Sequence, residues 1–228
     1  MMICSLDKDN GVMKLVSIER AIYVNIPDVG KETLTNAHHY GGPELVQQLI
    51  EDYFGIDLAG YVEIAFDGFI DIVDALGGID IELTKLEALG LNGDFNELYP
   101  ENDALVWERV SEGWNHLQGH DTLMYCRMRA IDSDWHRIER QRNTIQALVD
   151  KTKTATLGQI VGMIKGVLNN TITNLPAREI CALIACAGRF KGTTAEQLTV
   201  PVHSNPIVCD YAAESVRLHD FIYGPPQN

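Results

Sequence analysis

The chain has 228 residues, 46% of them hydrophobic and 22% charged, which is ordinary for a globular protein that buries a full core. Its formal net charge of -14 at pH 7 repels the phosphates of DNA and RNA, so no nucleic-acid partner is expected. No CxxC pair occurs among the cysteines, which are predicted to be core thiols: Cys4, Cys126, Cys181, Cys186 and Cys209.

The first half of the chain alternates predicted strands with predicted helices. In chain order these are strands at 1–7, 12–19 and 22–26, a polar loop to about residue 35, a helix opening at Gly41-Gly42-Pro43-Glu44 and stopping near Gly55, a strand at 60–66, a helix to Gly77-Gly78 and a strand at 79–83. Asn10-Gly11 favours a hairpin turn between the first two strands. Asp67 is predicted to cap the second helix.

The second half of the chain is predicted to be mainly helical. A weakly patterned stretch from about 85 to 115 is expected to be a long loop with short elements. Helices at 119–126, 135–153, 157–169 and 177–188 follow, then a short strand near 198–202 and a helix at 208–222. Alternating strands and helices predict an α/β domain whose sheet is covered on both sides.

The sequence contains no run of about 18 apolar residues, so no transmembrane helix is predicted, and no signal peptide is recognisable. The first residues, Met-Met-Ile-Cys-Ser-Leu, already have the pattern of a buried strand. We therefore expect the chain to be cut from a longer protein.

The segment 125–143 contains five arginines and no lysine, in a chain with only 18 basic residues. Arginine has a planar fork that grips two phosphate oxygens and never loses its charge. If 127–129 is extended, Arg127 and Arg129 point to one face, and Arg137, Arg140 and Gln141 share one stripe of a helix.

Two interpretations of this segment compete. One is a solvated surface on which the arginines form ion pairs with Asp132, Asp134 and Glu139. The other is an anion site beside a helix N-terminus, where free N–H groups attract negative charge and Asp134 caps the helix or braces Arg137. The excess of arginine over lysine and the acidic background favour the anion site.

The same residues resemble the LytR-CpsA-Psr family of cell-envelope proteins. That family has a pattern close to Leu-x-Gly-x-x-x-Leu-x-Tyr-x-Arg-x-Arg, then Asp-x-Asp-x-x-Arg-x-x-Arg-Gln. This chain has Leu117-Gln-Gly119-His-Asp-Thr-Leu123-Met-Tyr125-Cys-Arg127-Met-Arg129, then Asp132-Ser-Asp134-Trp-His-Arg137-Ile-Glu-Arg140-Gln141. Further landmarks occur in the expected order: Val16-Ser17-Ile18-Glu19-Arg20, Asn36-Ala37…Tyr40-Gly41-Gly42, Phe69…Val73-Asp74-Ala75-Leu76-Gly77-Gly78 and Phe221-Ile222-Tyr223-Gly224.

The resemblance implies a single domain over 1–228 with three α/β/α layers and a central mixed sheet flanked by helices on both faces. It implies a site outside the cytoplasmic membrane of a bacterium, tethered by an N-terminal transmembrane helix that precedes this sequence. Family members transfer a glycopolymer with its phosphate from a polyprenyl pyrophosphate carrier to peptidoglycan of the cell wall, with Mg²⁺. The alternatives are a non-catalytic polyprenyl pyrophosphate binder and, following a label sometimes given to the family, a transcriptional regulator or attenuator.

The resemblance also assigns roles to individual residues. The pyrophosphate ligands would be Arg20, Arg127, Arg129, Arg137, Arg140 and Gln141. The residues expected to act in the reaction are Arg20, Arg127, Arg129, Asp134 and Arg137, with Asp134 orienting the arginines. An apolar tunnel or groove beside them would hold the lipid.

The chain departs from the family pattern at the expected metal ligands and beside them. Ala21 stands where the family usually has a metal-binding Asp, and Thr33 stands in place of a basic residue. A second metal-binding Asp would fall upstream of Met1. Because Mg²⁺ needs oxygen ligands, we expect pyrophosphate binding with little Mg²⁺-dependent transfer, and the metal ligands stay unassigned.

Other candidate features have simpler explanations. The pairs His38-His39 and His116/His120 are not expected to hold a metal, and His136 is expected at the surface rather than on phosphate. Trp107, Trp114 and Trp135 are predicted to pack in the core or at its rim. Gly158, Gly162 and Gly166 would serve either close packing of their helix or room for a lipid chain.

Overall fold

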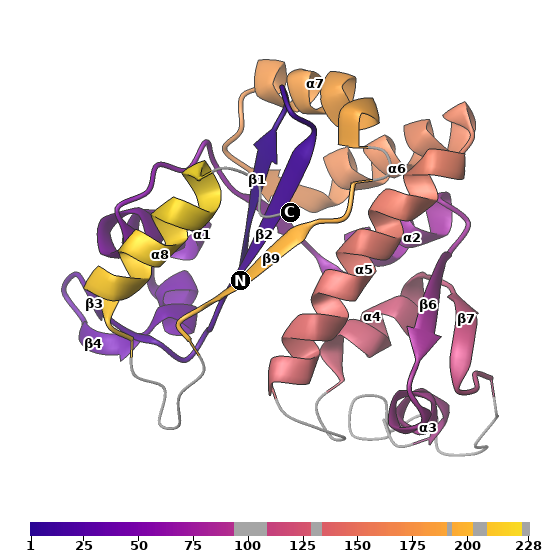
Figure 1. The fold of residues 1–228 in the computed structure, drawn as a ribbon, viewed down its shortest axis with the longest axis horizontal. Coiled ribbons are helices and arrows are strands. Elements are labelled where there is room, and N and C mark those ends of the chain that lie inside the picture. The colour runs from indigo at the N-terminus through magenta and orange to yellow at the C-terminus, as the bar shows by residue number, and fades with distance from the viewer. Residues whose placement is uncertain (94–108, 129–133, 191–192, 203–208, 225–228) are drawn as a thin grey trace. The chain divides into compact units, whose positions relative to one another are not determined.

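The fold is known from a computed structural model that describes residues 1–93, 109–128, 134–190, 193–202 and 209–224 (Figure 1). These residues belong to two compact units, one made of Met1–Glu63 and Ile172–Asn228 and the other of Ile64–Thr171. The expected single domain stays a prediction. Two short strands, β5 (Val62–Ile64) and β8 (Thr171–Thr173), lie where the chain passes between the units.

The first unit is built on a mixed sheet of three strands, β1 (Met2–Asp7), β2 (Val12–Ile18) and β9 (Glu196–Val200). β1 and β2 form the predicted hairpin, with Asp7 opposite Val12 next to the turn, and β9 runs parallel to β2. Gly11 has a φ of 67°, which glycine adopts without strain. The Asp7 carboxylate accepts hydrogen bonds from the backbone N–H groups of Asp9 and Asn10, which close the turn.

The segment after β2 contains one element that the sequence pattern missed. The predicted strand near 22–26 is β3 (Tyr23–Ile26), but the expected polar loop contains β4 (Gly30–Thr33), antiparallel to β3. The helix α1 (Leu34–Phe54) also begins earlier than predicted. Gly41 and Gly42 interrupt its helical backbone, so the predicted start at Pro43 matches the beginning of its second segment.

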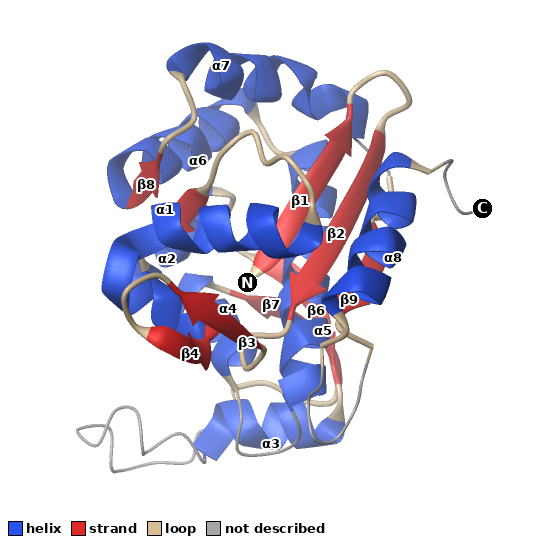
Figure 2. Ribbon diagram, turned by 90° about the vertical axis from the view of Figure 1, so that its left-hand side faces the viewer, coloured by secondary structure: helices blue, strands red, loops and turns tan. Residues whose placement is uncertain are grey.

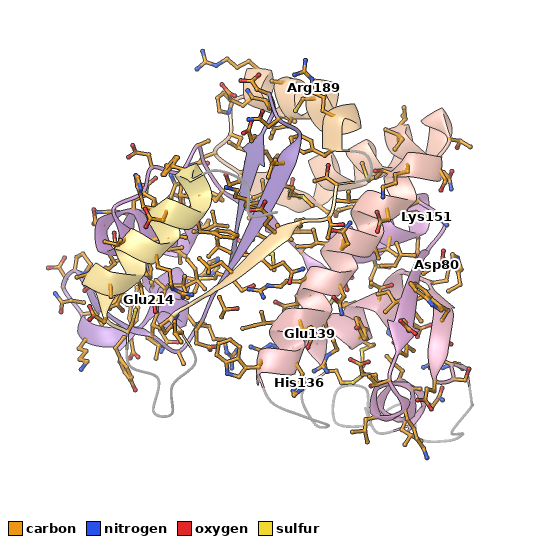
Figure 3. All side chains as sticks on the ribbon, in the orientation of Figure 1. Asp80, His136, Glu139, Lys151, Arg189 and Glu214 are labelled. Atoms are coloured by element: carbon orange, nitrogen blue, oxygen red, sulfur yellow. The ribbon has the colours of Figure 1, made fainter. Side chains whose placement is uncertain are left out.

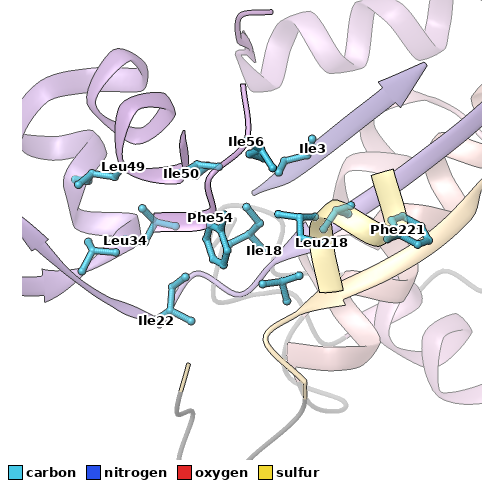
Figure 4. Packing of buried hydrophobic residues seen from close by; sticks show 14 of the residues in the cluster. Ile3, Ile18, Ile22, Leu34, Leu49, Ile50, Phe54, Ile56, Leu218 and Phe221 are labelled. Atoms are coloured by element: carbon cyan, nitrogen blue, oxygen red, sulfur yellow. The ribbon is translucent and has the colours of Figure 1, made fainter. Parts of the chain in front are cut away.

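The core of the first unit lies between the sheet and two helices, α1 and α8 (Tyr211–Tyr223), which pack against each other (Figures 1 and 2). Phe54 is buried among aliphatic side chains from β2, α1 and α8, including Ile18, Leu34 and Leu218 (Figure 4). The unit also contains α7 (Ala177–Cys186) and the 3₁₀ helix η2 (Ala187–Phe190). The helices predicted at 177–188 and 208–222 are therefore confirmed over their described residues.

The second unit contains most of the predicted helices. Its elements are α2 (Phe66–Ala75), β6 (Ile79–Leu83), α3 (Lys85–Gly93), β7 (Gly113–Leu117), α4 (Gly119–Arg127), α5 (Asp134–Thr154) and α6 (Leu157–Asn170). The stretch 85–115 holds α3 and the start of β7, and residues 94–108 lie outside the described part. β6 pairs antiparallel with β7, with Ile79, Ile81 and Leu83 turned into the core.

One predicted cap is wrong. Asp67 was expected to cap α2, but the helix begins at Phe66 and Ala65 occupies the N-cap position without a side-chain hydrogen bond. Asp67 instead lies in the first turn, where its charge suits the helix dipole. The helix ends at Gly77-Gly78 as predicted, and both glycines have positive φ.

Two of the three glycines of α6 face a neighbouring helix. A Cβ at Gly162 would lie 3.3 Å from the Cβ of Ala75, and one at Gly166 would lie 3.5 Å from Ile72, both on α2. A Cβ at Gly158 would meet only Thr156 of its own N-cap. Between the two explanations of these residues, the structure therefore favours close packing at Gly162. No helix in the described part of the chain has the length and apolar character to cross a membrane.

Two side-chain predictions are wrong. Cys4 on β1 is exposed, whereas Cys126, Cys186 and Cys209 are partly buried free thiols; the side chain of Cys181 lies outside the described part. Trp114 on β7 is 72% exposed and so belongs to no core, and Trp107 falls among the residues that are not described. The α/β class and the mixed sheet are confirmed.

Candidate anion-binding site

The candidate site lies where α4 ends and α5 begins. Arg127 is the last residue of α4, and Met128 after it leaves the helix with φ -53° and ψ 129°. The extended backbone predicted for 127–129 is thus present at Met128 but not at Arg127. Arg129 and Asp132 lie outside the described residues, as does the side chain of Asp134 at the start of α5.

Three contacts tie the end of α4 to α5 on both sides of Arg127. Before it, the carbonyl of Cys126 accepts a hydrogen bond from Gln141 Nε2 at 3.5 Å, and its Sγ lies 3.1 Å from Thr144 Oγ1. After it, the carbonyl of Met128 accepts a hydrogen bond of 2.8 Å from the guanidinium of Arg140. The backbone on either side of Arg127 is therefore fixed by α5.

Arg140 is fully buried, with 1% of its surface exposed. Its guanidinium lies 3.4 Å from the Glu87 carboxylate, which also accepts hydrogen bonds of 2.9 Å from the backbone and hydroxyl of Thr84. A buried arginine whose charge is matched by a carboxylate contributes to the fold rather than to an open anion site. These contacts favour a structural role for Arg140 over the predicted contact with pyrophosphate.

Burial also changes the acidity of neighbouring groups. It raises the pKa of Tyr125 to about 12, with the negative charge of Glu87 as the second cause. It raises the pKa of the Cys126 thiol to about 11, while the hydrogen bond to Thr144 acts in the opposite direction. Cys126 is therefore a neutral packing thiol at physiological pH and no nucleophile.

The predicted stripe of α5 is present. Arg137 is 8% exposed and, like Arg140, turns inward, whereas His136 and Glu139 are exposed near the start of the helix (Figure 3). Arg137 and Gln141 lie one turn apart on the side that meets α4. The structure thus brings Arg127, Arg137 and Gln141 to the same pair of helices, and His136 is a surface residue as predicted.

Arg127 is held by an aromatic ring. Its guanidinium carbon lies 4.1 Å from the ring centroid of Phe66, the first residue of α2. Phe66 is 55% exposed, so its ring is not part of the core. Sequence reasoning missed this residue, because Phe66 was placed at the end of the predicted strand 60–66, where an apolar side chain is too common to single it out.

Arg20 belongs to the first unit, where it follows β2. Its backbone carbonyl accepts hydrogen bonds from the backbone N–H of Thr35 at 3.3 Å and from the Thr35 hydroxyl at 2.9 Å. These bonds fix its position against the first turn of α1. Convergence of Arg20 with the arginines of the second unit stays a prediction.

No Mg²⁺ ligands are assigned among the described residues, and Mg²⁺ binding stays a prediction. Ala21, partly exposed after Arg20, offers no side-chain oxygen, and no group of three or more His, Cys, Asp or Glu suited to a metal occurs in the described part. His38 instead contacts Glu63 at 3.2 Å, and His116 contacts Asp80 at 2.6 Å and the Gly77 carbonyl at 2.8 Å. His38 and His116, one member of each histidine pair, thus face carboxylates and a carbonyl.

Comparison with known proteins identifies the relatives of this chain. The sequence model of the LytR_cpsA_psr family matches residues 1–219. One relative, named polyisoprenyl-teichoic acid–peptidoglycan teichoic acid transferase TagV, from Bacillus subtilis (strain 168), is 29% identical over 208 residues, which cover 88% of this chain and 50% of the relative. The chain thus spans about half the length of the curated relatives it matches.

Solved structures share its fold. A structure described as TagT bound to LIIa-WTA has a TM-score of 0.75 at 22% identity, covering 97% of this chain and 84% of the other. A second, described as the LytR-CPS2A-psr family protein YwtF (TagT) with bound octaprenyl pyrophosphate lipid, has a TM-score of 0.69 at 20% identity and covers 97% and 83%.

Proposed function

The chain belongs to the LytR_cpsA_psr family, and on this premise we propose that it binds a polyprenyl pyrophosphate-linked glycopolymer and acts in its transfer to peptidoglycan. The name of the TagV relative supports the transfer, and the octaprenyl pyrophosphate bound in the YwtF structure supports the ligand. The proposed localisation is the outer face of a bacterial cytoplasmic membrane, to which an N-terminal helix would tether the protein.

The proposal rests on how the backbone and the guanidinium of Arg127 are held. Its backbone is fixed on both sides by α5, and its guanidinium carbon lies over the Phe66 ring, with no carboxylate partner for the guanidinium among the described residues. A guanidinium that keeps its charge and its N–H groups at a helix end is suited to a phosphate. Arg137 and Gln141 would add donors from α5.

In the proposed reaction, a hydroxyl oxygen of the acceptor forms a bond to the phosphorus that carries the glycopolymer. The bond from that phosphorus to the bridging oxygen of the lipid phosphate breaks, the polyprenyl phosphate leaves with the negative charge, and the proton of the acceptor hydroxyl is released to solvent. Arg20, Arg127, Arg129 and Arg137 would bind the phosphate oxygens and stabilise this charge, and Asp134 would orient the arginines. Mg²⁺, where bound, would neutralise further phosphate charge.

Substitution of Arg137 tests the anion site. Arg137→Ala should weaken binding of a long-chain polyprenyl pyrophosphate by roughly 1.5–3 kcal/mol, the usual scale for a hydrogen bond to a charged group. Isothermal titration calorimetry measures the affinity, and circular dichroism checks that the variant is folded. The control is Arg178→Ala, which removes an arginine with an 84% exposed side chain on α7. If folded Arg137→Ala and the control bind with equal affinity, Arg137 does not belong to a pyrophosphate-binding site.

A second candidate function is favoured by Ala21. A chain that lacks this carboxylate would bind the lipid pyrophosphate and turn it over poorly, which describes a non-catalytic binder. Both functions require an apolar slot for the lipid, because each buried CH₂ contributes roughly 0.8 kcal/mol. A long-chain polyprenyl phosphate should therefore raise the melting temperature more than a short-chain analogue. An equal rise of the melting temperature with both ligands would show that the protein has no apolar slot for the lipid tail.

A further inference from the structure

Phe66 has no packing reason to be aromatic. It begins α2, more than half of its surface is exposed, and it is absent from both hydrophobic clusters of the described residues. Its ring nevertheless lies 4.1 Å from the guanidinium carbon of Arg127. At this distance the positive charge interacts with the electron-rich face of the ring.

The two helices that carry this pair are held together rigidly. α4 begins against α2, where the backbone N–H of Gly119 donates a 2.7 Å hydrogen bond to the carboxylate of Asp74, near the end of α2. A Cβ at Gly119 would lie 2.4 Å from the carbonyl oxygen of Ile70, so the backbones are in direct contact there. The far end of α4 then brings Arg127 to the first residue of α2.

Arg127 and Arg140 are held in opposite ways. Arg140 pairs with Glu87 through one terminal nitrogen and donates to the Met128 carbonyl through the other, so its charge is matched and both terminal nitrogens are engaged within the protein. The Arg127 guanidinium carbon lies over the Phe66 ring, 4.1 Å from its centroid, and a phenylalanine ring has no oxygen or nitrogen that could accept the N–H groups of the arginine. An aromatic brace can therefore fix the plane of an arginine and leave its charge and its donor edge to an anion.

We propose that Phe66 is a positioning residue that orients the Arg127 guanidinium toward the pyrophosphate group of the ligand. The inference rests on the proposed function, since it concerns the same anion site. It adds a residue outside the arginine segment and a physical reason for an exposed phenylalanine on α2. The ring acts on the pyrophosphate through Arg127 and makes no contact with the ligand.

The proposal predicts a graded series of variants. Phe66→Leu removes the ring but keeps an apolar side chain, and it should weaken binding of geranylgeranyl pyrophosphate by roughly 2- to 5-fold, the scale of an exposed cation–π contact. Phe66→Tyr keeps the ring and should restore the wild-type affinity. Trp114→Leu is the matched control, because it removes a more exposed aromatic ring from the same unit and should leave the affinity unchanged.

A double-mutant cycle separates positioning from direct contact. If Phe66 acts through Arg127, Phe66→Leu should have no further effect on affinity in an Arg127→Ala background. A loss of the same size in both backgrounds would overturn the proposal, because the ring would then touch the ligand itself. Unchanged affinity of Phe66→Leu alone would overturn it as well.

An NMR measurement distinguishes failure of this inference from failure of the proposed function. The side-chain Nε–Hε signal of Arg127 should carry a ring-current shift that disappears in Phe66→Leu and is kept in Phe66→Tyr. If the wild type shows this shift but binds no pyrophosphate, the proposed function is refuted, although the contact of Phe66 with Arg127 exists. If the shift is absent, the contact itself is refuted, whatever the protein binds.

Discussion

Lys14 shows how a single residue can be misread from sequence. It lies in β2, inside the run 12–19 that reads as an apolar strand, and its side chain is buried. Its ammonium donates to the carbonyl oxygens of Phe221 at 2.8 Å and Gly224 at 3.0 Å, and it lies 3.9 Å from the Glu196 carboxylate. Lys14 thus satisfies carbonyls at the end of α8, where a positive charge also suits the helix dipole.

Replacement of this lysine should destabilise the first unit. Lys14→Met keeps the apolar stem but leaves the carbonyls at the end of α8 without their donor, so the free energy of unfolding should fall by about 2–3 kcal/mol. Urea denaturation followed by circular dichroism measures this. Lys31→Met, which removes an exposed lysine from beside Tyr23, should change the value by less than about 0.5 kcal/mol. If the two substitutions change the free energy of unfolding equally, the hydrogen bonds of Lys14 to the carbonyls at the end of α8 do not contribute to stability.

The candidate site could be predicted from sequence in kind but not in detail. The arginine motif located Arg127, Arg137 and Gln141 at the junction of two helices, because helical spacing is a local property. It did not separate Arg140 from the others, since the partner that buries it, Glu87, lies 53 residues earlier in the chain. The contact of Arg127 with Phe66 is equally non-local. Long-range partners decide which arginines stay available, and a pattern does not contain them.

At the scale of elements, local turn chemistry predicted well, and the starts of α4 to α7 were predicted within one residue, whereas the start of α1 was missed. The hairpin of β1 and β2 follows from Asn10-Gly11, and the end of α2 follows from Gly77-Gly78. The start of α1 was missed because only Leu34 and Ala37 of its first segment are apolar and buried, and Gly41-Gly42 interrupt the pattern before it continues. β4 was missed because it is short and lies between turn residues.

The glycines of helices α4 and α6 allow a sharp test of helix packing. Gly119→Ala would bring a Cβ to 2.4 Å from the backbone oxygen of Ile70, so we expect a loss of roughly 2–4 kcal/mol in the free energy of unfolding. Gly166→Ala meets only ordinary contacts of 3.5 Å or more, and its higher helix propensity should stabilise the protein by up to ~1 kcal/mol. Thermal and urea unfolding measure both. A stabilising Gly119→Ala would refute the close approach of α4 to α2.

At the scale of the whole molecule, the α/β class followed from the alternation of strands and helices, whereas the division of the described residues into two units did not. The second unit is an insertion between Glu63 and Ile172, and no change in composition marks its borders. The predicted ligands are divided accordingly, with Arg20 in the first unit and Arg127, Arg137 and Gln141 in the second. Binding of pyrophosphate is therefore a property to be measured on the whole chain.

The balance between binding and turnover is the last property of the whole chain that the residues allow us to predict. Acidic residues outnumber basic ones by 32 to 18, yet no metal-binding group of three or more forms among the described residues, and Ala21 offers no ligand beside Arg20. We therefore expect binding of polyprenyl pyrophosphate with little effect of Mg²⁺ on affinity or on transfer.

Ala21→Asp should raise the Mg²⁺ dependence of both affinity and transfer, because it adds a carboxylate to a partly exposed position where the charge can be hydrated when no metal is present. Ala21→Asn is the matched control, since it has nearly the same size and a single neutral side-chain oxygen. Calorimetry with and without Mg²⁺ and an assay of glycopolymer transfer to peptidoglycan measure the two effects. Strong Mg²⁺ dependence of the unaltered chain would contradict this account, because it would require metal ligands other than the residue at position 21.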